Sequence, residues 1–175
     1  AFVVTPAGVL VVDALGSPAL AEELIAAIRR VTPQPIRVVV VTHYHADHVY
    51  GLQAFKAAGA RIVAHGAGRE YLASDAAQRR LEASRQELYP AVDERTRLVE
   101  ADEWLAGADR SIELGGKTFH IRHVGPAHTP EDLVVYEPQS GVLFAGDNIQ
   151  SINRRFDVFI SQRNIQIVTR DVSAE

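Results

Sequence analysis

The sequence predicts a mixed α/β fold in a single domain, and three observations support this prediction. The first half of the chain alternates apolar β-branched runs with segments of helical periodicity. The second half consists mainly of short strands separated by turn residues. The chain has 175 residues, of which 47% are hydrophobic and 23% are charged. This is enough apolar material for one domain with a sizeable core, which we expect to cover residues 1–175.

Hydrophobic periodicity and turn residues predict seven elements in the first half. They are strands at 2–4 and 9–12, a helix from 17 to 33, a strand at 37–41, a helix at 49–58, a strand at 61–64 and a helix at 74–88. Pro6 and Gly8 mark a turn between the first two strands, which favours a hairpin. Ser17 followed by Pro18 is a typical helix start. The continuous β-branched run at 37–41 is typical of a strand buried on both faces.

The later helices have clear ends, because Gly59 follows one and Pro90 follows the other. From Arg95 onward the pattern changes to short strands, which we predict at 96–99, 111–114, 118–124, 133–136 and 142–145. Gly115 and Gly116 mark a tight turn between two of these strands. We therefore expect hairpins to dominate the second half.

Composition excludes several classes of protein. The formal net charge of −4 and the pI near 6.0 provide no basic field for a phosphate backbone, so we expect no nucleic-acid partner. No run approaches the roughly 18 apolar residues that span a bilayer, so we expect a soluble protein with no membrane partner. The chain has no cysteine, so a metal site must use nitrogen and oxygen ligands. It also has no methionine, which indicates a processed or trimmed chain and leaves a cytoplasmic or a periplasmic location open.

The segment from His43 to His48 is the strongest functional signal in the sequence. It reads His-Tyr-His-Ala-Asp-His and supplies four potential metal ligands within six positions, just after the predicted strand at 37–41. Imidazoles and a carboxylate crowded at one strand end leave lone pairs and charge that a cation satisfies best. The sequence therefore predicts a metal site here.

Two further residues at predicted strand ends are candidate partners of this segment. His128 follows the strand at 118–124, and Asp147 follows the strand at 142–145. Residues just beyond the carboxyl ends of strands converge in crevices of sheets that helices cover. We expect neither His65, His120 nor His123 to bind a metal directly.

The spacing within the segment allows two ions. His43 and His45 point the same way if the chain stays extended, and a turn at 46–47 lets Asp47 and His48 face a second ion. Two neighbouring divalent ions supply a bridging hydroxide at neutral pH and a Lewis acid for the bond under attack. Asp147 is suited to bridge them.

Three motifs together resemble those of the metallo-β-lactamase superfamily. They are the His43-x-His45-x-Asp47-His48 run, the Gly125-Pro-Ala-His128-Thr-Pro segment and the Phe144-Ala-Gly-Asp147 strand end. The resemblance covers about residues 2–148. It implies an αββα sandwich with a metal centre, usually of zinc, at one edge between the two sheets.

The resemblance also implies a role for each candidate residue. The first metal would bind His43, His45 and His128. The second would bind Asp47 and His48, and Asp147 would lie between the two ions. Asp47 would in addition orient the hydroxide and accept its proton, which makes it the candidate catalytic residue.

The sequence departs from the family near its C-terminus. Family members generally supply one more histidine to the second metal, and this chain has no histidine after His128. The tail at 151–175 also does not resemble the closing helix and strand of the family. Either the chain is incomplete at its C-terminus or the site is altered. The number of bound ions, one or two, therefore stays open.

The leading hypothesis is a hydrolase that uses zinc-bound hydroxide to cleave a small ester, thioester or lactam. His48 and Asp147 resemble the glyoxalase II-like and periplasmic zinc hydrolase branches more than the commonest zinc β-lactamases. One alternative is a sulfur oxidoreductase of the same superfamily with a single iron ion. Another is a truncated binding module without catalysis. The substrate and the oligomeric state stay open.

Overall fold

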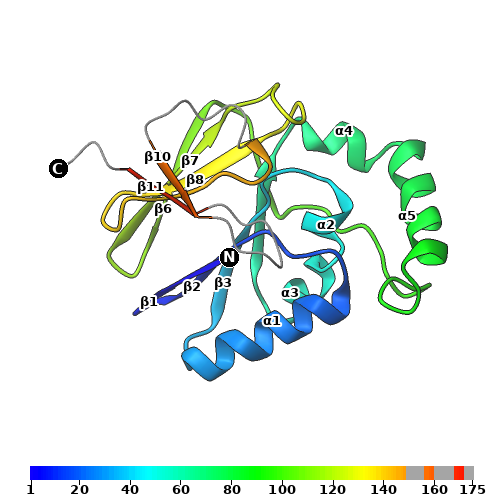
Figure 1. The fold of residues 1–175 in the computed structure, drawn as a ribbon, viewed down its shortest axis with the longest axis horizontal. Coiled ribbons are helices and arrows are strands. Elements are labelled where there is room, and N and C mark those ends of the chain that lie inside the picture. Colours follow the sequence, from blue (N-terminus) through cyan, green and yellow to red (C-terminus); the bar gives the residue numbers. More distant parts are fainter. Residues whose placement is uncertain (149–155, 160–167, 172–175) are drawn as a thin grey trace.

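The computed structural model describes residues 1–148, 156–159 and 168–171. In this part of the chain, the strands form one sheet of five strands and one of six. The helices gather on one side of the molecule, next to the five-stranded sheet, and the six-stranded sheet lies on the other side (Figure 1). The mixed α/β fold predicted from the sequence is confirmed.

The first sheet contains five strands in the order of the chain. They are β1 (Phe2–Thr5), β2 (Gly8–Val12), β3 (Ile36–Val40), β4 (Arg61–His65) and β5 (Glu103–Leu105). β1 and β2 pair antiparallel, which confirms the predicted hairpin, and the other neighbours pair parallel. The parallel strands therefore end at the same edge of the sheet, where functional side chains converge.

The helices connect and cover these strands. They are α1 (Pro18–Val31), α2 (Ala46–Val49), α3 (Leu52–Ala57), α4 (Gly68–Leu72) and α5 (Asp75–Glu87). α1 begins where the sequence predicts, because the Ser17 hydroxyl accepts a hydrogen bond from Leu20 N at 3.2 Å. The apolar face of α1 buries Ala21, Ile25 and Ile28.

The second sheet has the order β10-β11-β9-β8-β7-β6, and its neighbouring strands pair antiparallel. Its strands are β6 (Asp109–Leu114), β7 (Lys117–His123), β8 (Leu133–Glu137), β9 (Val142–Phe144), β10 (Phe156–Phe159) and β11 (Val168–Asp171). Gly115 and Gly116 connect β6 to β7 with φ angles of 59° and 82°, a region that favours glycine. The predicted tight turn is thus confirmed.

The side chains of the first sheet divide between two apolar clusters. Leu10, Val38 and Val40 pack against residues of the second sheet such as Phe119 and Ile121. Alternate residues of the same strands point to the helices instead, as the two-residue period of a strand requires. β2 and β3 are therefore buried on both faces, which explains why they read as continuous apolar runs.

The predicted strand at 96–99 is wrong, and β5 takes the place beside β4. Side chains satisfy the backbone of the earlier segment, so it needs no neighbouring strand. Arg85 donates to the carbonyl oxygen of Thr96 at 2.8 Å, and Gln53 accepts from Arg97 N at 3.1 Å. These tertiary contacts override the local β-propensity of the segment.

The predicted helix at 49–58 is two short helices, because the chain turns between α2 and α3. Gly51 lies so close to Ala14 that an added Cβ would overlap the carbonyl oxygen of that residue. The Gly51 N–H donates to the carbonyl oxygen of Leu15 at 3.1 Å, outside any helical pattern. Three further elements, α4, β10 and β11, were not predicted from the sequence.

A third, smaller apolar cluster lies on the far face of the second sheet. Val134 belongs to it, whereas its neighbour Val135 points to the core between the sheets. Apart from the strands β10 and β11, the tail predicted as atypical at 151–175 lies outside the described residues.

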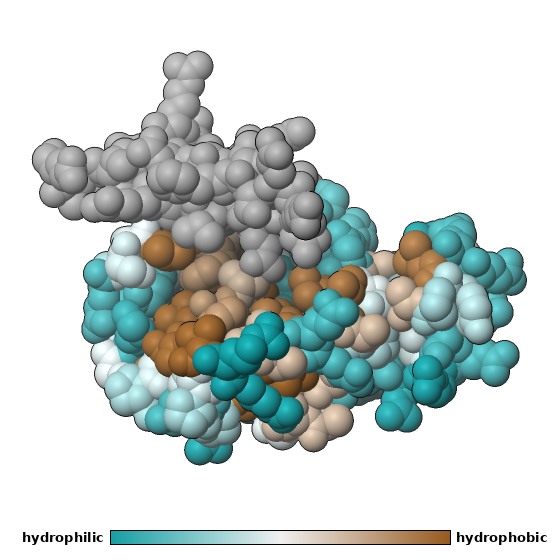
Figure 2. All heavy atoms as spheres, turned by 60° about the horizontal axis from the view of Figure 1, so that its bottom comes forward, coloured by the Kyte–Doolittle hydropathy of each residue, from teal (hydrophilic) through white to brown (hydrophobic). Residues whose placement is uncertain are grey.

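The surface seen from below Figure 1 is mixed in character. Figure 2 shows apolar side chains gathered in the middle of this face, with hydrophilic side chains around them.

Within the described ranges, no helix combines the length and the apolar character that a membrane span requires.

Candidate metal centre

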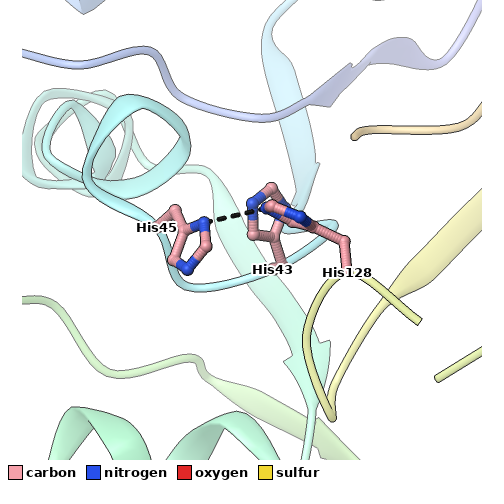
Figure 3. Close-up of side chains that lie close together, drawn as sticks. All are labelled: His43, His45 and His128. Atoms are coloured by element: carbon pink, nitrogen blue, oxygen red, sulfur yellow. Dashed lines mark hydrogen bonds between the residues drawn. The ribbon is translucent and has the colours of Figure 1, made fainter. Parts of the chain in front are cut away.

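The structure brings all six predicted site residues together: His43, His45, Asp47, His48, His128 and Asp147. They come from both sheets. The segment 43–48 follows β3, His128 lies in the loop between β7 and β8, and Asp147 follows β9. Figure 3 shows the rings of His43, His45 and His128 close together, with the loops of the two sheets meeting around them. The strand-end argument from the sequence predicted this convergence.

Three histidines form the first group of candidate ligands. One ring nitrogen from each of His43, His45 and His128 lies within 4.8 Å of the others. His45 Nδ1 and His128 Nε2 are 3.0 Å apart (Figure 3). His43 is buried, whereas His45 and His128 are exposed. The group is therefore buried on the side of His43 and open to solvent on the side of His45 and His128.

A second group shares His43 with the first. Atoms of His43, His48 and Asp147 also lie within 4.8 Å of one another. The two carboxylate oxygens of Asp147 divide between the groups, since Oδ1 is 3.3 Å from His48 Nε2 and Oδ2 is 3.5 Å from His128 Nε2. Asp147 thus lies where the sequence analysis expects a bridging ligand.

Asp47 belongs with the second group. Its Oδ2 atom lies 3.3 Å from His48 Nε2, and its side chain is 74% exposed. The carboxylate therefore reaches the candidate ligands while it stays open to water and to a substrate.

His43 carries an unsatisfied polar atom at the centre of the site. Its Nδ1 atom lies 3.1 Å from the Thr42 hydroxyl, but its buried Nε2 atom has no hydrogen-bond partner among the described residues. Asp147 Oδ2 is 3.8 Å from this nitrogen, beyond hydrogen-bonding distance. Buried polar atoms are rarely left without a partner. A metal ion coordinated by Nε2 fits this observation, and the nitrogen and oxygen donors around it suit a divalent ion.

Asp13 contacts two of the candidate ligands and was not predicted from the sequence as part of the site. It lies buried directly after β2, at the same edge as the candidate ligands. Its Oδ1 atom accepts from Thr42 N at 2.8 Å, and its Oδ2 atom is 2.9 Å from His48 Nδ1. Through the Thr42 hydroxyl it also reaches His43. An aspartate placed directly after a buried strand was the signal that could have found it.

The charges of the site depend on one another. In the absence of a bound ion, burial disfavours a charged His48, but Asp13 and the neighbouring carboxylates outweigh this and raise the pKa of His48 to about 12, so an ion that binds His48 has to displace a proton. The hydrogen bond from His48 lowers the pKa of Asp47 and of Asp147. Burial lowers the pKa of His43 to about 4, so this imidazole is neutral and free to coordinate an ion at pH 7.

The other histidines lie apart from these groups. His65 and His123 stack on each other, with ring centroids 3.7 Å apart, and His123 Nε2 lies 2.8 Å from the Pro130 carbonyl oxygen. His120 is exposed and contacts Ser111 instead. Among the described residues, none of the three joins a cluster that could hold a metal ion.

A cleft of about 330 Å³ opens beside His45. Its lining comes from α4 and the segment before it, and from the loop that carries His128: His45, Ala67, Glu70, Tyr71, Thr129, Pro130 and Glu131. This volume suits a small ligand.

The family model of the metallo-beta-lactamase superfamily matches residues 1–170. The chain belongs to this superfamily. The match covers both sheets and every residue of the candidate centre, and it confirms the resemblance found from the three motifs.

Two curated relatives of this superfamily member are enzymes. The chain is 26% identical to the linear primary-alkylsulfatase of Pseudomonas sp. (strain ATCC 19151) over 83% of its own length and 32% of the relative. It is 27% identical to the hydroxyacylglutathione hydrolase of Legionella pneumophila (strain Corby) over 73% of its length and 40% of the relative. The chain thus spans about a third to two fifths of these relatives.

Solved structures of the superfamily share the fold. A metallo-beta-lactamase from Pontibacter korlensis superposes with a TM-score of 0.63 at 24% identity, over 82% of this chain and 57% of that one. An inverting sec-alkylsulfatase from Pseudomonas sp. superposes with a TM-score of 0.62 at 19% identity, over 81% of this chain and 27% of that one. At these identities the likeness concerns the fold alone.

Proposed function

We propose that this chain is the metal-binding part of a hydrolase. His43, His45 and His128 would hold one ion, Asp47 and His48 would hold a second, and Asp147 is placed to contact both groups of ligands. The observation that carries this proposal is the buried His43 Nε2 atom, which has no partner among the described residues and lies at the junction of two groups of ligands. Zinc suits a site made of imidazole and carboxylate ligands.

A bound divalent ion supplies a Lewis acid and lowers the pKa of a water molecule. The residues of the chain provide the rest of the chemistry. Asp47, exposed beside the second group, orients the attacking water and accepts its proton. Asp13 holds His48 and, through Thr42, orients His43. The cleft beside His45 positions the substrate.

The proposed substrates are small esters, thioesters or lactams. The superfamily match, the hydroxyacylglutathione hydrolase relative and the metallo-beta-lactamase neighbours support this class. The volume of the cleft also supports a small molecule rather than a polymer.

The test combines metal analysis with a substrate panel. The protein is purified without chelators and without added metal, its metal content is measured by elemental analysis, and thioesters, esters and lactams are assayed. We expect one or two zinc ions per chain and hydrolysis that a chelator abolishes and zinc restores. His128→Ala should lower the zinc content, whereas His120→Ala, the same substitution on the outer face, should not. Absence of hydrolysis across the panel in zinc-loaded protein would contradict the proposal.

Metal analysis also decides between this proposal and a mononuclear iron oxidoreductase. Anaerobically purified protein that contains iron and consumes oxygen with a thiol substrate would favour the oxidoreductase. Bound zinc without oxygen consumption would favour the hydrolase.

A sulfate ester is a second candidate substrate. Alkylsulfatases occur among the curated relatives and among the structural neighbours. Release of inorganic sulfate from dodecyl sulfate tests this candidate. Sulfate release in the absence of thioester and ester hydrolysis would replace the first substrate class with this one.

A further inference from the structure

The cleft beside His45 carries two carboxylates that the proposed reaction does not use. Glu131 belongs to the loop that carries His128, and Glu70 belongs to α4. Because His45 also lines this cleft, a substrate bound in the cleft lies beside a candidate metal ligand and both acidic side chains. Their state therefore bears on which substrates fit.

Glu131 is nearly buried, and only one of its two carboxylate oxygens forms a hydrogen bond within the described residues. Only 5% of its surface is exposed. Its Oε1 atom accepts a hydrogen bond from Tyr44 N at 3.2 Å, in the segment between His43 and His45. Among the described residues, its Oε2 atom has no hydrogen bond and no Lys, Arg or His forms an ion pair with either oxygen. Because Glu131 lines the cleft and Oε2 is not among the buried atoms that lack a partner, this oxygen is open to a cation that enters the cleft.

Glu70 adds a second negative charge without a counter-ion. It is exposed and, like Glu131, it forms no ion pair within the described part of the chain. The neighbouring Arg69 forms no ion pair in this part of the chain, and its guanidinium carbon lies 5.9 Å from the centre of the Trp104 ring. Two carboxylates in one cleft attract a cation and repel an anion.

The lining of the cleft is also partly apolar. Beside the two carboxylates it includes Ala67, Pro130 and Tyr71. Such a wall suits an alkylated ammonium group, because the aromatic face and the carboxylates both attract a cation while the methyl groups contact apolar surface.

We propose that this cleft binds a positively charged amine of the substrate, through Glu131 and Glu70. The preferred substrate of the proposed hydrolase is then an ester or thioester with an ammonium group near the bond that is cleaved. This inference rests on the proposed function for its substrate class. It also argues against the sulfate-ester candidate, because an anionic group would meet these carboxylates.

The experiment compares two thioesters of the same shape. Butyrylthiocholine carries a quaternary ammonium group, and 3,3-dimethylbutyl thiobutyrate replaces it with a neutral tert-butyl group. With zinc-loaded protein we expect the charged thioester to have a KM lower by about tenfold, the effect of one partly buried charge pair. Glu131→Gln and Glu70→Gln should each reduce the ratio of the KM of the neutral thioester to that of the charged one, and Glu131→Gln should reduce it more. Glu23→Gln, an equal charge change on the exposed face of α1, should leave the ratio unchanged.

Binding of butyltrimethylammonium to the same proteins, measured by titration calorimetry, separates this inference from the proposed function. If neither thioester is hydrolysed, the proposed function fails, and weaker ammonium binding in Glu131→Gln still supports the cleft. If both thioesters are hydrolysed with equal KM in all four proteins, the inference is wrong and the function stands. Thermal unfolding of Glu131→Gln shows whether this variant is folded. If it is not, Glu70→Gln, a substitution at an exposed position, tests the inference in its place.

Discussion

His43 is the residue on which both groups of candidate ligands converge. It is 1% exposed, its Nδ1 atom lies against Thr42, and its Nε2 atom points between the other ligands. A buried imidazole without a second partner is costly in a protein that binds no ion. The arrangement is therefore explained most simply by coordination, with Asp13 as the group that fixes both His43 and His48.

Replacing Asp47 tests the role of the exposed carboxylate. In Asp47→Asn the side chain keeps its shape but loses its charge and its ability to accept a proton. We expect turnover to fall by about 100- to 10,000-fold, the usual contribution of a general base. Steady-state kinetics on zinc-loaded protein measure the change. Near-normal turnover would contradict the role proposed for Asp47, and unchanged thermal unfolding would confirm that the fold is intact.

Replacing Asp13 tests a residue that touches no proposed substrate. Asp13→Asn removes the negative charge next to His48 while asparagine still tolerates the positive φ angle of 62° found here. We expect zinc affinity to fall by about 10- to 100-fold, as for other groups that orient metal ligands. Competition with a chromophoric chelator measures the affinity. Asp109→Asn, an exposed aspartate on β6, is the control, and equal affinities for the two variants would exclude the positioning role.

At the scale of elements, the candidate centre depends on where strands end. β3 and β9 belong to different sheets, and the segments that follow them carry His43 and Asp147. The loop before β8 brings His128, and its Thr129 donates through the backbone N–H and the hydroxyl to the buried Asp132. Rigid strands and a braced loop hold the ligands without the help of a long helix.

Glu137, the last residue of β8, is a buried carboxylate that should make stability depend on pH. Glu137 is 1% exposed; burial would raise its pKa, but hydrogen bonds from Ser140, Lys117 and Gln139 outweigh burial and hold the pKa below its ordinary value of 4.5. A carboxyl with a lowered folded pKa stabilises the protein above the unfolded pKa, and this stabilisation is lost as the pH falls through the folded pKa.

We therefore expect Glu137→Gln to lower the free energy of unfolding at pH 7 by about 1–3 kcal/mol, the cost of losing charged hydrogen bonds. The difference between variant and wild type should shrink as the pH falls below 4.5. Urea unfolding between pH 7 and pH 3 measures both effects. A difference that stays constant over this range would show that Glu137 does not carry the pH dependence.

At the scale of the whole molecule, the two sheets together make the centre. The core between them joins residues such as Val40 of β3 to Phe144 of β9. The segments that follow these strands carry the candidate ligands, so the packing of one sheet on the other decides whether the two groups of ligands meet.

Metal binding should couple to global stability. At a free zinc concentration of about 100 times the Kd, the folded chain gains about 2.7 kcal/mol, which corresponds to about 5–10 °C in Tm for a chain of this size. Scanning calorimetry with zinc and with a chelator measures the shift. His43→Ala should abolish the shift, and His120→Ala should retain it. A Tm that does not respond to zinc would argue against a metal centre built into the fold.

The sequence by itself determined the α/β class, the hairpins and the six candidate residues of the centre. These follow from local signals: strand and helix periodicity, Gly115 and Gly116 at a turn, and the dense segment 43–48. Such signals are readable because they act within a few residues. The single domain over residues 1–175 and the metal-binding role of each residue stay predictions.

Only the tertiary structure decided which groups act together. The contact of Asp13 with His48, the replacement of the predicted strand at 96–99 by β5 and the position of Glu131 in the cleft all depend on residues distant in the chain. No local pattern reports which distant donor meets a buried carboxylate, because packing and hydrogen bonding between segments settle that after the chain folds. The candidate metal ligands could therefore be predicted from the sequence, whereas the residues that hold them in place and the cleft beside them could not.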